Sequence, residues 1–566
     1  MEHIEQIVDV LNYYVWSFGV PAGGETIPWL VLLLLGTGVF LTIRLRFIQF
    51  RRLAHGFAVT SGRYDDPDHP GDVSHFQALA TALSATVGIG NIAGVAIAIH
   101  WGGPGALFWM WMTAVFGMAV KFSEVTLAQA YRDVRHDADA HKWEGSVSGG
   151  PMYYIERGLG RRWKPLAVAF AVILGTTALL NGNAVQANTV ADTMHTALGI
   201  PPWTMGLVTA SIVALVILGG IRRIGKVTGI LSPVMASIYL VGALIIVVMN
   251  AGEILPTLAL IIREAFNPSA GIAGTGAGVF AMTLMWGVRQ GAFSNEAGQG
   301  SAPIAHAAAK TNEPVSEGVV GLVEPFIDTI VIITITAFVI ILTGSWDDGV
   351  PTEVALAGGD LSYVVPDEDG RYVRAAAPAE IRVEDGAVRP STIEEPFLAW
   401  HEVRVERLFE DEAQSRPFTG VINPAEGTAR SADGTVHVRL FGDAVESGAP
   451  LTMLAFRRGL APLGDWGHYV VIVSVLLFAV STAIAWCYYG DRSVHYLIGP
   501  QAVLPYRIVY VVMHFFGAVL PLVVVWNLGS VFLGAVMVPN LIALIMLNRK
   551  VCELSDSYFA RRPWME

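Results

Sequence analysis

The chain has 566 residues, of which 53% are hydrophobic and only 15% are charged, and its mean hydropathy is +0.52. This composition excludes a soluble enzyme of this length and is typical of a membrane protein with several spanning helices. The net charge of −12 is unevenly placed, because residues 345–450 contain 21 acidic residues against 9 arginines and no lysine. The remainder is neutral, so we expect no nucleic-acid partner.

The two cysteines, Cys487 and Cys552, exclude a disulfide-rich exterior, and we expect both to be free thiols. The beginning of the chain lacks a basic start, a short apolar core and a small-residue cleavage site. We therefore expect no signal peptide, and the apolar segments that follow are expected to hold the chain in the bilayer.

Eleven segments are apolar enough to cross a bilayer, for which a helix needs about 20 residues. The predicted fold is thus an all-α polytopic membrane protein. The predicted spans are residues 27–43, 76–99, 105–130, 166–194, 204–220, 229–249, 273–293, 319–343, 468–488, 508–525 and 531–547.

Lysines and arginines predict how the chain is oriented, because they gather in cytoplasmic loops. The loops after the first, third, fifth, seventh and ninth spans and the segment after the eleventh carry them, whereas residues 100–104 and 199–203 carry none. This pattern predicts an outside N-terminus, a cytoplasmic C-terminus and a lipid bilayer around the spans, as in a plasma membrane. The acidic segment falls outside.

Three Asp-Gly pairs punctuate this acidic segment, at Asp369-Gly370, Asp385-Gly386 and Asp433-Gly434. Each lies beside alternating apolar and polar residues, and Asp-Gly is a favoured hairpin turn. We predict a small β-rich domain. It is interpreted as a solvated spacer, with a lid or a surface for a protein partner as the alternatives.

The second predicted span is interrupted by Gly88, Gly90, Asn91 and Gly94. A helix broken at membrane depth leaves amides and carbonyls without partners, and lipid cannot supply them. The free amides attract a carboxylate and the free carbonyls attract a cation. This pattern is expected of a discontinuous helix in a secondary transporter.

The seventh predicted span has glycines crowded in its outer half, at Gly271, Gly274, Gly276 and Gly278. With the first span set aside, two five-helix halves each open on an interrupted helix and run in opposite directions, which predicts an inverted repeat. The predicted parts are an N-terminal peripheral helix with a basic loop (1–75), the first repeat (76–250), the start of the second (251–343), the insert (344–465), the end of the second repeat (466–548) and a cytoplasmic tail (549–566).

Three long motifs resemble a known family. GGPGALFWMWMTAVFG (102–117), GGPMYYIERGLG (149–160) and GAFSNEAGQGSAPIAHAAAKT (291–311) are similar to signature segments of the alanine or glycine:cation symporters. The resemblance covers the chain except the insert. It implies a sodium-coupled amino-acid carrier, with a five-plus-five inverted repeat similar to the sodium:neurotransmitter-transporter fold and one extra N-terminal helix.

The chain departs from that family in two ways. Members usually have Gly-Thr-Gly-Asn where this chain has Gly88-Ile89-Gly90-Asn91, so a hydroxyl is missing. The insert is also atypical. The missing hydroxyl bears on which substrate is preferred. The insert bears on an added role on the outer side of the membrane.

Free amides of Ile89 and Gly90 are predicted to bind the carboxylate of a zwitterionic amino acid. The alternative is that the glycines only let helices pack closely. Further substrate contacts are expected from Asn91 and Gln186, with Phe280, Trp286 and Trp526 as candidate apolar walls, although polar groups and aromatics in spans also serve packing.

A sodium site is expected where the adjacent hydroxyls of Ser481 and Thr482 meet the carbonyls of Ser84 and Val87, as the resemblance implies. The alternative is that the hydroxyls bond back to their own helix. Asn91 and Asp328 are candidates for a second cation site.

Asp328 is predicted to lie roughly 18 Å into the eighth span, where a carboxylate costs about 2.5–3.5 kcal/mol and so must face a partner. That partner is either a cation or Arg289. Lys121 and Glu124 are three residues apart on one helix face and are interpreted as structural.

These features predict symport of a small neutral amino acid, alanine or glycine, with Na⁺ by alternating access, without enzymatic activity and without a bound cofactor. The alternatives are a proton-coupled transporter or a channel for another small solute, and a receptor built on the insert. No repeated pore-lining sequence favours the channel, and Asp328 alone is the sequence's argument for protons.

Overall fold

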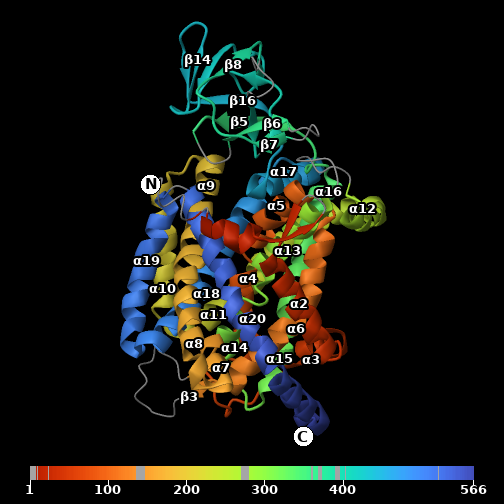
Figure 1. The fold of residues 1–566 in the computed structure, drawn as a ribbon, viewed down its shortest axis with the longest axis vertical. Helices are drawn as coiled ribbons and strands as arrows, with labels where there is room; N and C mark the ends of the chain where they lie inside the picture. Colours follow the sequence, from red (N-terminus) through yellow and green to blue (C-terminus); the bar gives the residue numbers. More distant parts are fainter. Residues whose placement is uncertain are drawn as a thin grey trace.

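The computed structural model describes residues 8, 10–22, 25–134, 147–268, 279–357, 361–366, 372–388, 396–401, 403–520 and 522–565. Its main body is a bundle of long helices, and a β-rich domain projects from one end (Figure 1). The end of the chain lies at the opposite end of the molecule, which also carries α3 (Ile48–Thr60) and α7 (Pro151–Leu159) (Figure 1). The basic segments that follow the first and third predicted spans therefore share one end.

Seven helices of the described residues are long and apolar enough to cross a membrane, and a bent pair brings the number to eight. The pair is α2 (Trp29–Arg44) and α3, which meet at 80°. The seven are α6 (Ala106–Ala130), the run Arg161–Leu198, α11 (Gly220–Met249), the run Pro314–Leu342, α18 (Gly467–Ile498), the run Pro500–Val519 and Leu528–Arg561. The polytopic membrane class is confirmed, whereas the count of eleven stays a prediction.

Two of these runs contain a wide π-helical turn. The first comprises η3 (Arg161–Trp163), α8 (Lys164–Leu179), η4 (Leu180–Ala184) and α9 (Val185–Leu198). The second comprises α15 (Pro314–Pro325), η6 (Phe326–Ile333) and α16 (Thr334–Leu342). Such turns are rare and often occur at functional sites, and Asp328 lies in the second.

The second predicted span is broken, as the glycines indicate. Helix α4 (His75–Thr86) ends, a 3₁₀ turn η2 (Ile89–Asn91) follows, and α5 (Ala93–Gly102) begins. A second break separates α13 (Val279–Asn295) from α14 (Ala302–His306), with Glu296, Gly298 and Gly300 at positive φ between them. The glycines expected to interrupt that span, Gly271 to Gly278, lie outside the described residues.

The remaining helices, turns and short strands connect the long helices of the bundle or lie at its ends. Helix α20 is continuous from Leu522 to Arg561, so the predicted boundary between the last two spans, at 525–531, is wrong, and the preceding helix already ends at Val519. The other elements are η1 (Tyr13–Ser17), β1 (Gly19–Ala22), β2 (Glu25–Pro28), β3 (Asp133–Val134), β4 (Val147–Ser148), α10 (Pro202–Ile217), η5 (Ala251–Glu253), α12 (Ile254–Phe266), η7 (Ala461–Leu463), η8 (Pro500–Ala502), α19 (Val503–Val519) and η9 (Pro563–Met565).

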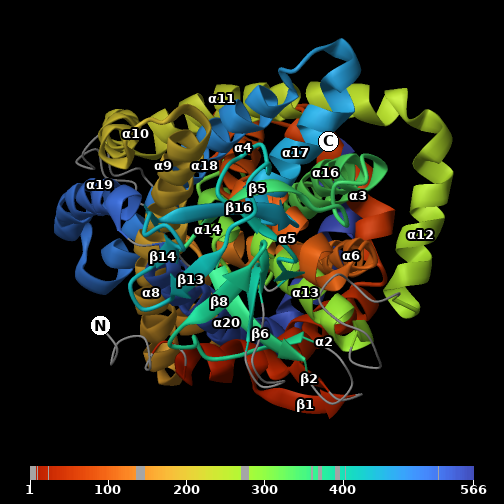
Figure 2. The same cartoon turned by 90° about the horizontal axis from the view of Figure 1, so that it is seen from above.

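The insert is a β domain, as predicted, and from above it covers part of the bundle (Figure 2). Its first and last strands, β5 (Val350–Ala355) and β16 (Arg439–Ala444), pair along their whole length and form a stalk. The other strands are β6 (Leu361–Pro366), β7 (Tyr372–Arg374), β8 (Ile381–Glu384), β9 (Ala387–Val388), β10 (Phe397–Trp400), β11 (Val403–Arg404), β12 (Leu408–Phe409), β13 (Gly420–Asn423), β14 (Thr428–Ser431) and β15 (Val436–His437).

These strands form sheets in the orders β11-β10-β6-β7, β12-β16-β5 and β15-β14-β13-β8-β9. Asp385-Gly386 turns β8 into β9 with both residues at positive φ, and Asp433-Gly434 lies between β14 and β15. Two of the three predicted hairpins are thus confirmed, and Asp369-Gly370 lies outside the described residues. Helix α17 (Gly448–Leu460) ends the expected insert and packs on α5 and α18.

Candidate functional site

The break after α4 leaves backbone donors unused inside the protein. Asn91 Oδ1 accepts from the amide of Gly88 at 2.9 Å, and the amide of Asn91 donates to the carbonyl of Gly88 at 3.1 Å. The amides of Ile89 and Gly90 have no acceptor among the described residues. Because both residues are buried, these donors form a site that suits a carboxylate.

A hydroxyl pair on α18 lies against the end of α4. Ser481 Oγ and Thr482 Oγ1 lie 3.3 and 3.1 Å from the carbonyl oxygen of Ser84, and Thr482 Oγ1 lies 3.4 Å from that of Ala85. Three of the four predicted sodium ligands are therefore together, with Val87 the first residue after the helix. Hard cations prefer such oxygen clusters.

Gly88 allows this close approach. A Cβ atom at Gly88 would lie 2.7 Å from Thr482 Oγ1, which is shorter than real Cβ contacts. Its φ of −133° suits any residue, so space and not backbone conformation requires glycine here. The contact between the break and α18 therefore explains why residue 88 is a glycine.

Asp328 joins the two broken helices. Its Oδ1 accepts from Asn91 Nδ2 at 2.7 Å, and its Oδ2 accepts from Ser294 Oγ at 3.1 Å and from Thr329 Oγ1 at 2.8 Å. Asn91 is at the first break, and Ser294 is in the last turn of α13, just before the second break. A fully buried carboxylate whose hydrogen-bond donors among the described residues are all neutral is chemically suited to a cation.

Arg289 was the alternative partner of Asp328, and the described residues show no ion pair between them. Arg289 donates to Ser530 Oγ at 3.2 Å and lies 4.9 and 5.0 Å from the rings of Trp16 and Trp286. The structural pairing expected as one alternative is therefore wrong.

The other predicted substrate residues are Gln186, Trp286, Phe280 and Trp526. Gln186 is buried and donates to the carbonyl of Asn181 at 3.2 Å, while its Oε1 has no partner among the described residues. Trp286 stacks on Trp101 of α5 and has an unpartnered buried Nε1. Both therefore keep free polar atoms inside the bundle, as a ligand contact would require.

Phe280 is not brought to the break. It lies in the first turn of α13, 38% exposed and 6.0 Å from the ring of Trp109. Ser294 is 14 residues further along the helix, roughly 21 Å away. Trp526 lies in α20, and its side chain is outside the described part of the chain.

A buried charged cluster, which the sequence analysis missed, lies next to the second break. Glu317 contacts both His75 and His306, the latter at 2.5 Å, and Glu324 pairs with Lys121 at 3.0 Å. Glu317 and Glu324 are seven residues apart and so share one face of α15. Two glutamates seven residues apart in an apolar span are the sequence pattern from which the cluster could have been predicted.

Lys121 and Glu124 belong to this buried network, in agreement with a structural role. Glu124 accepts from Asn540, which also accepts from Tyr154. These contacts join α6, α7 and α20 near the end of the molecule that carries the basic loops (Figure 1).

The chain matches the model of the sodium:alanine symporter family over residues 1–368 and 434–564. The chain belongs to the sodium:alanine symporter family. The family resemblance that the three motifs indicate is confirmed. The unmatched residues, 369–433, are part of the predicted insert, 344–465, whose remaining residues match the family model.

Characterised and uncharacterised relatives match along nearly the whole chain. A sodium/alanine symporter of Methanococcus maripaludis is 37% identical over 98% of this chain and 96% of its own length. An uncharacterized transporter of Haemophilus influenzae is 34% identical over 99% and 97%. A probable sodium/glutamine symporter of Bacillus subtilis is 30% identical over 98% and 91%. Membership therefore supports cation-coupled symport of an alanine-type amino acid through a membrane.

Proposed function

We propose that this chain carries alanine or glycine together with Na⁺ into the cell across the plasma membrane. The observation that supports this most is the buried break at Ile89 and Gly90, whose free amides lie beside the Ser84, Ser481 and Thr482 oxygens. A carboxylate and an alkali cation would bind on opposite ends of the same interruption. Each ligand would then stabilise the conformation that the other requires.

The transport cycle that we propose is alternating access of two inverted five-helix repeats. Eleven passes, with the N-terminus and the insert outside and the C-terminus in the cytoplasm, fit the basic segments gathered at the end away from the insert (Figure 1). Asp328, held by Asn91 and Ser294, would respond to movement of either broken helix.

Proton coupling is the second candidate. A relative in Bacillus subtilis, 30% identical over 95% of this chain, is named a putative sodium/proton-dependent alanine carrier. In the part of the chain that the structure describes, the buried carboxylate of Asp328 has neutral hydrogen-bond donors alone, so a proton could take the place of a cation there.

Uptake of labelled alanine into proteoliposomes tests both candidates. We expect inward sodium to drive accumulation, and choline in its place to abolish it. Equal uptake in sodium and choline would contradict sodium coupling, and uptake driven by a pH jump without sodium would favour protons. Competition by glycine, serine, glutamine and D-alanine then ranks the substrates.

A further inference from the structure

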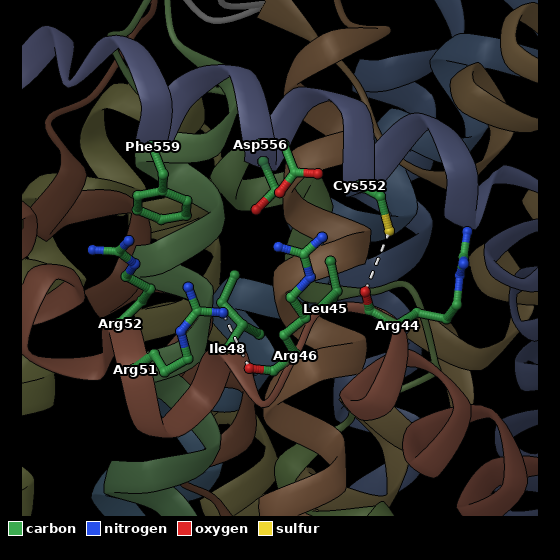
Figure 3. A pocket seen from close by; sticks show the side chains of 10 residues that line it. Arg44, Leu45, Arg46, Ile48, Arg51, Arg52, Cys552, Asp556 and Phe559 are labelled. Carbon is green, nitrogen blue, oxygen red and sulfur yellow. Dashed lines mark hydrogen bonds between the residues drawn. The ribbon is translucent and has the colours of Figure 1, made fainter.

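A cavity of about 240 Å³ lies between the α2–α3 elbow and the last turns of α20 (Figure 3). The elbow forms because Arg46 and Phe47 both adopt positive φ, at 55° and 58°, after α2 ends. Four arginines and one acidic residue line the cavity, and the arginines are Arg44, Arg46, Arg51 and Arg52. The lining therefore carries a net positive charge.

Among the described residues, none of the four arginines has an ion pair within 4.0 Å, although Asp556 faces the same cavity (Figure 3). Arg51 donates to the carbonyl of Arg46 at 3.2 Å, and Arg52 lies 3.9 Å from the ring of Phe559. The Nε atom of Arg52 is buried without a hydrogen-bond acceptor. Clustered guanidinium groups repel one another, and an anion in the cavity would remove that cost.

Phenylalanines beside the cavity face outward. Phe47, Phe50 and Phe57 are 53%, 70% and 42% exposed. Phe47 directly precedes α3, and the seven-residue spacing of Phe50 and Phe57 places those two on one side of the helix. Another side of α3 packs on α15, where Gly56 meets the carbonyl of Val319. A helix with exposed phenylalanines beside arginines is typical of a membrane interface, where apolar side chains meet acyl chains and guanidinium groups meet headgroups.

We propose that this cavity binds the phosphate group of an anionic phospholipid. The planar guanidinium groups supply paired N–H donors for phosphate oxygens, and the acyl chains lie along Phe47, Phe50 and Phe57. The bound lipid ties the last turns of α20 to the α2–α3 elbow. This site is separate from the break at Gly88, so the inference does not depend on which solute is carried.

Lipid binding to the full-length protein in a non-ionic detergent tests the proposal. Native mass spectrometry measures the affinity for phosphatidylglycerol in the parent protein and in a double variant, Arg46→Gln with Arg51→Gln. About 1 kcal/mol per arginine near a lipid surface predicts about thirtyfold weaker binding in the double variant. The matched control is Arg161→Gln with Arg162→Gln, two exposed arginines at the start of the Arg161–Leu198 run, and it should bind as the parent does.

Two further arms identify the source of the phosphate. Phosphatidylcholine and inorganic phosphate replace phosphatidylglycerol, with the shift in thermal unfolding midpoint as the readout. Phe50→Ser should weaken phosphatidylglycerol binding and leave any response to phosphate unchanged. Equal protection by phosphatidylcholine or by inorganic phosphate would overturn the lipid assignment, as would equal losses in the double variant and its control.

Discussion

The side-chain amide of Asn91 connects the first helix break to Asp328, because its Nδ2 donates to Asp328 Oδ1 at 2.7 Å while its Oδ1 accepts from the amide of Gly88 at 2.9 Å. One residue therefore fixes the unwound turn and orients a buried carboxylate. Any change in the charge of Asp328 should therefore alter the conformation of the unwound turn at the break.

We expect Asp328→Asn to raise the sodium concentration that half-saturates alanine uptake. Hydrogen bonds and contacts to a charged group contribute about 1.5–3 kcal/mol, so the shift should be about tenfold or more. Thr329→Val is the control, because it removes only the hydroxyl that lies 2.8 Å from Oδ2. If sodium dependence stays unchanged in Asp328→Asn and only stability falls, Asp328 is structural.

Gly88→Ala should abolish sodium-driven uptake for a steric reason. The new Cβ would lie 2.7 Å from Thr482 Oγ1, so the break or α18 must move. Gly94→Ala is the matched control, because its Cβ would meet only the Oε1 end of the Gln290 side chain, at 3.1 Å. Uptake assays of both variants check this, and normal uptake by Gly88→Ala would contradict the proposed site.

Thr482→Val keeps the shape of the side chain and removes the oxygen 3.1 Å from the Ser84 carbonyl. We expect weaker sodium binding, by about tenfold, since a cation ligand and one of the two hydroxyls on the Ser84 carbonyl are lost. Ser474→Ala on the same helix is the control, because that hydroxyl bonds back to Val470 at 2.7 Å. Sodium-dependent thermal protection gives both affinities, and equal shifts would argue against a cation site.

Glu317→Gln should destabilise the protein strongly. Glu317 is fully buried between His75 and His306, and breaking a buried ion pair costs about 3–5 kcal/mol. Glu313→Gln removes an exposed pair with Arg561, 53% exposed, and should cost at most about 1 kcal/mol. Unfolding midpoints in detergent compare the two, and equal midpoints would mean that the buried cluster adds no stability.

The insert can be removed without cutting the bundle. Ala355 and Arg439 are paired in the β5–β16 stalk, so an Asn-Gly turn can replace residues 356–438 as a two-residue hairpin. We expect the shortened protein to take up alanine at the parent rate, because Thr452 of α17 still donates to the carbonyl of Ile92 at 2.9 Å. A folded but inactive product would instead give the insert a direct role, with the His401 carbonyl, which lies 3.1 Å from His100 Nε2 of α5, as the first contact to test.

Local patterns predicted the features that depend on neighbouring residues. Glycines and an asparagine in an apolar span predicted the break at Gly88, and Asp-Gly predicted the turn at Asp385. The break after Asn295 was missed because its first residue is Glu296, and a glutamate at positive φ is uncommon. The glycines between Gly271 and Gly278 led instead to a predicted break at the other end of that span.

Tertiary partners could not be predicted from spacing. Lys121 is three residues from Glu124, yet its ion pair is with Glu324 on α15. Phe280 shares a helix with Ser294 but lies near its other end, beside Trp109. The family resemblance predicted that Ser84 meets Ser481 and Thr482, which lie almost 400 residues away in the chain.

The stalk formed by β5 and β16 means that the β domain leaves and rejoins the bundle at a single point. A segment attached this way can be gained or lost in one genetic event, since the helices on either side need not move apart to admit it. It also gives the carrier a folded domain that projects from one end of the helix bundle (Figure 1), against which an antibody fragment could be raised for imaging.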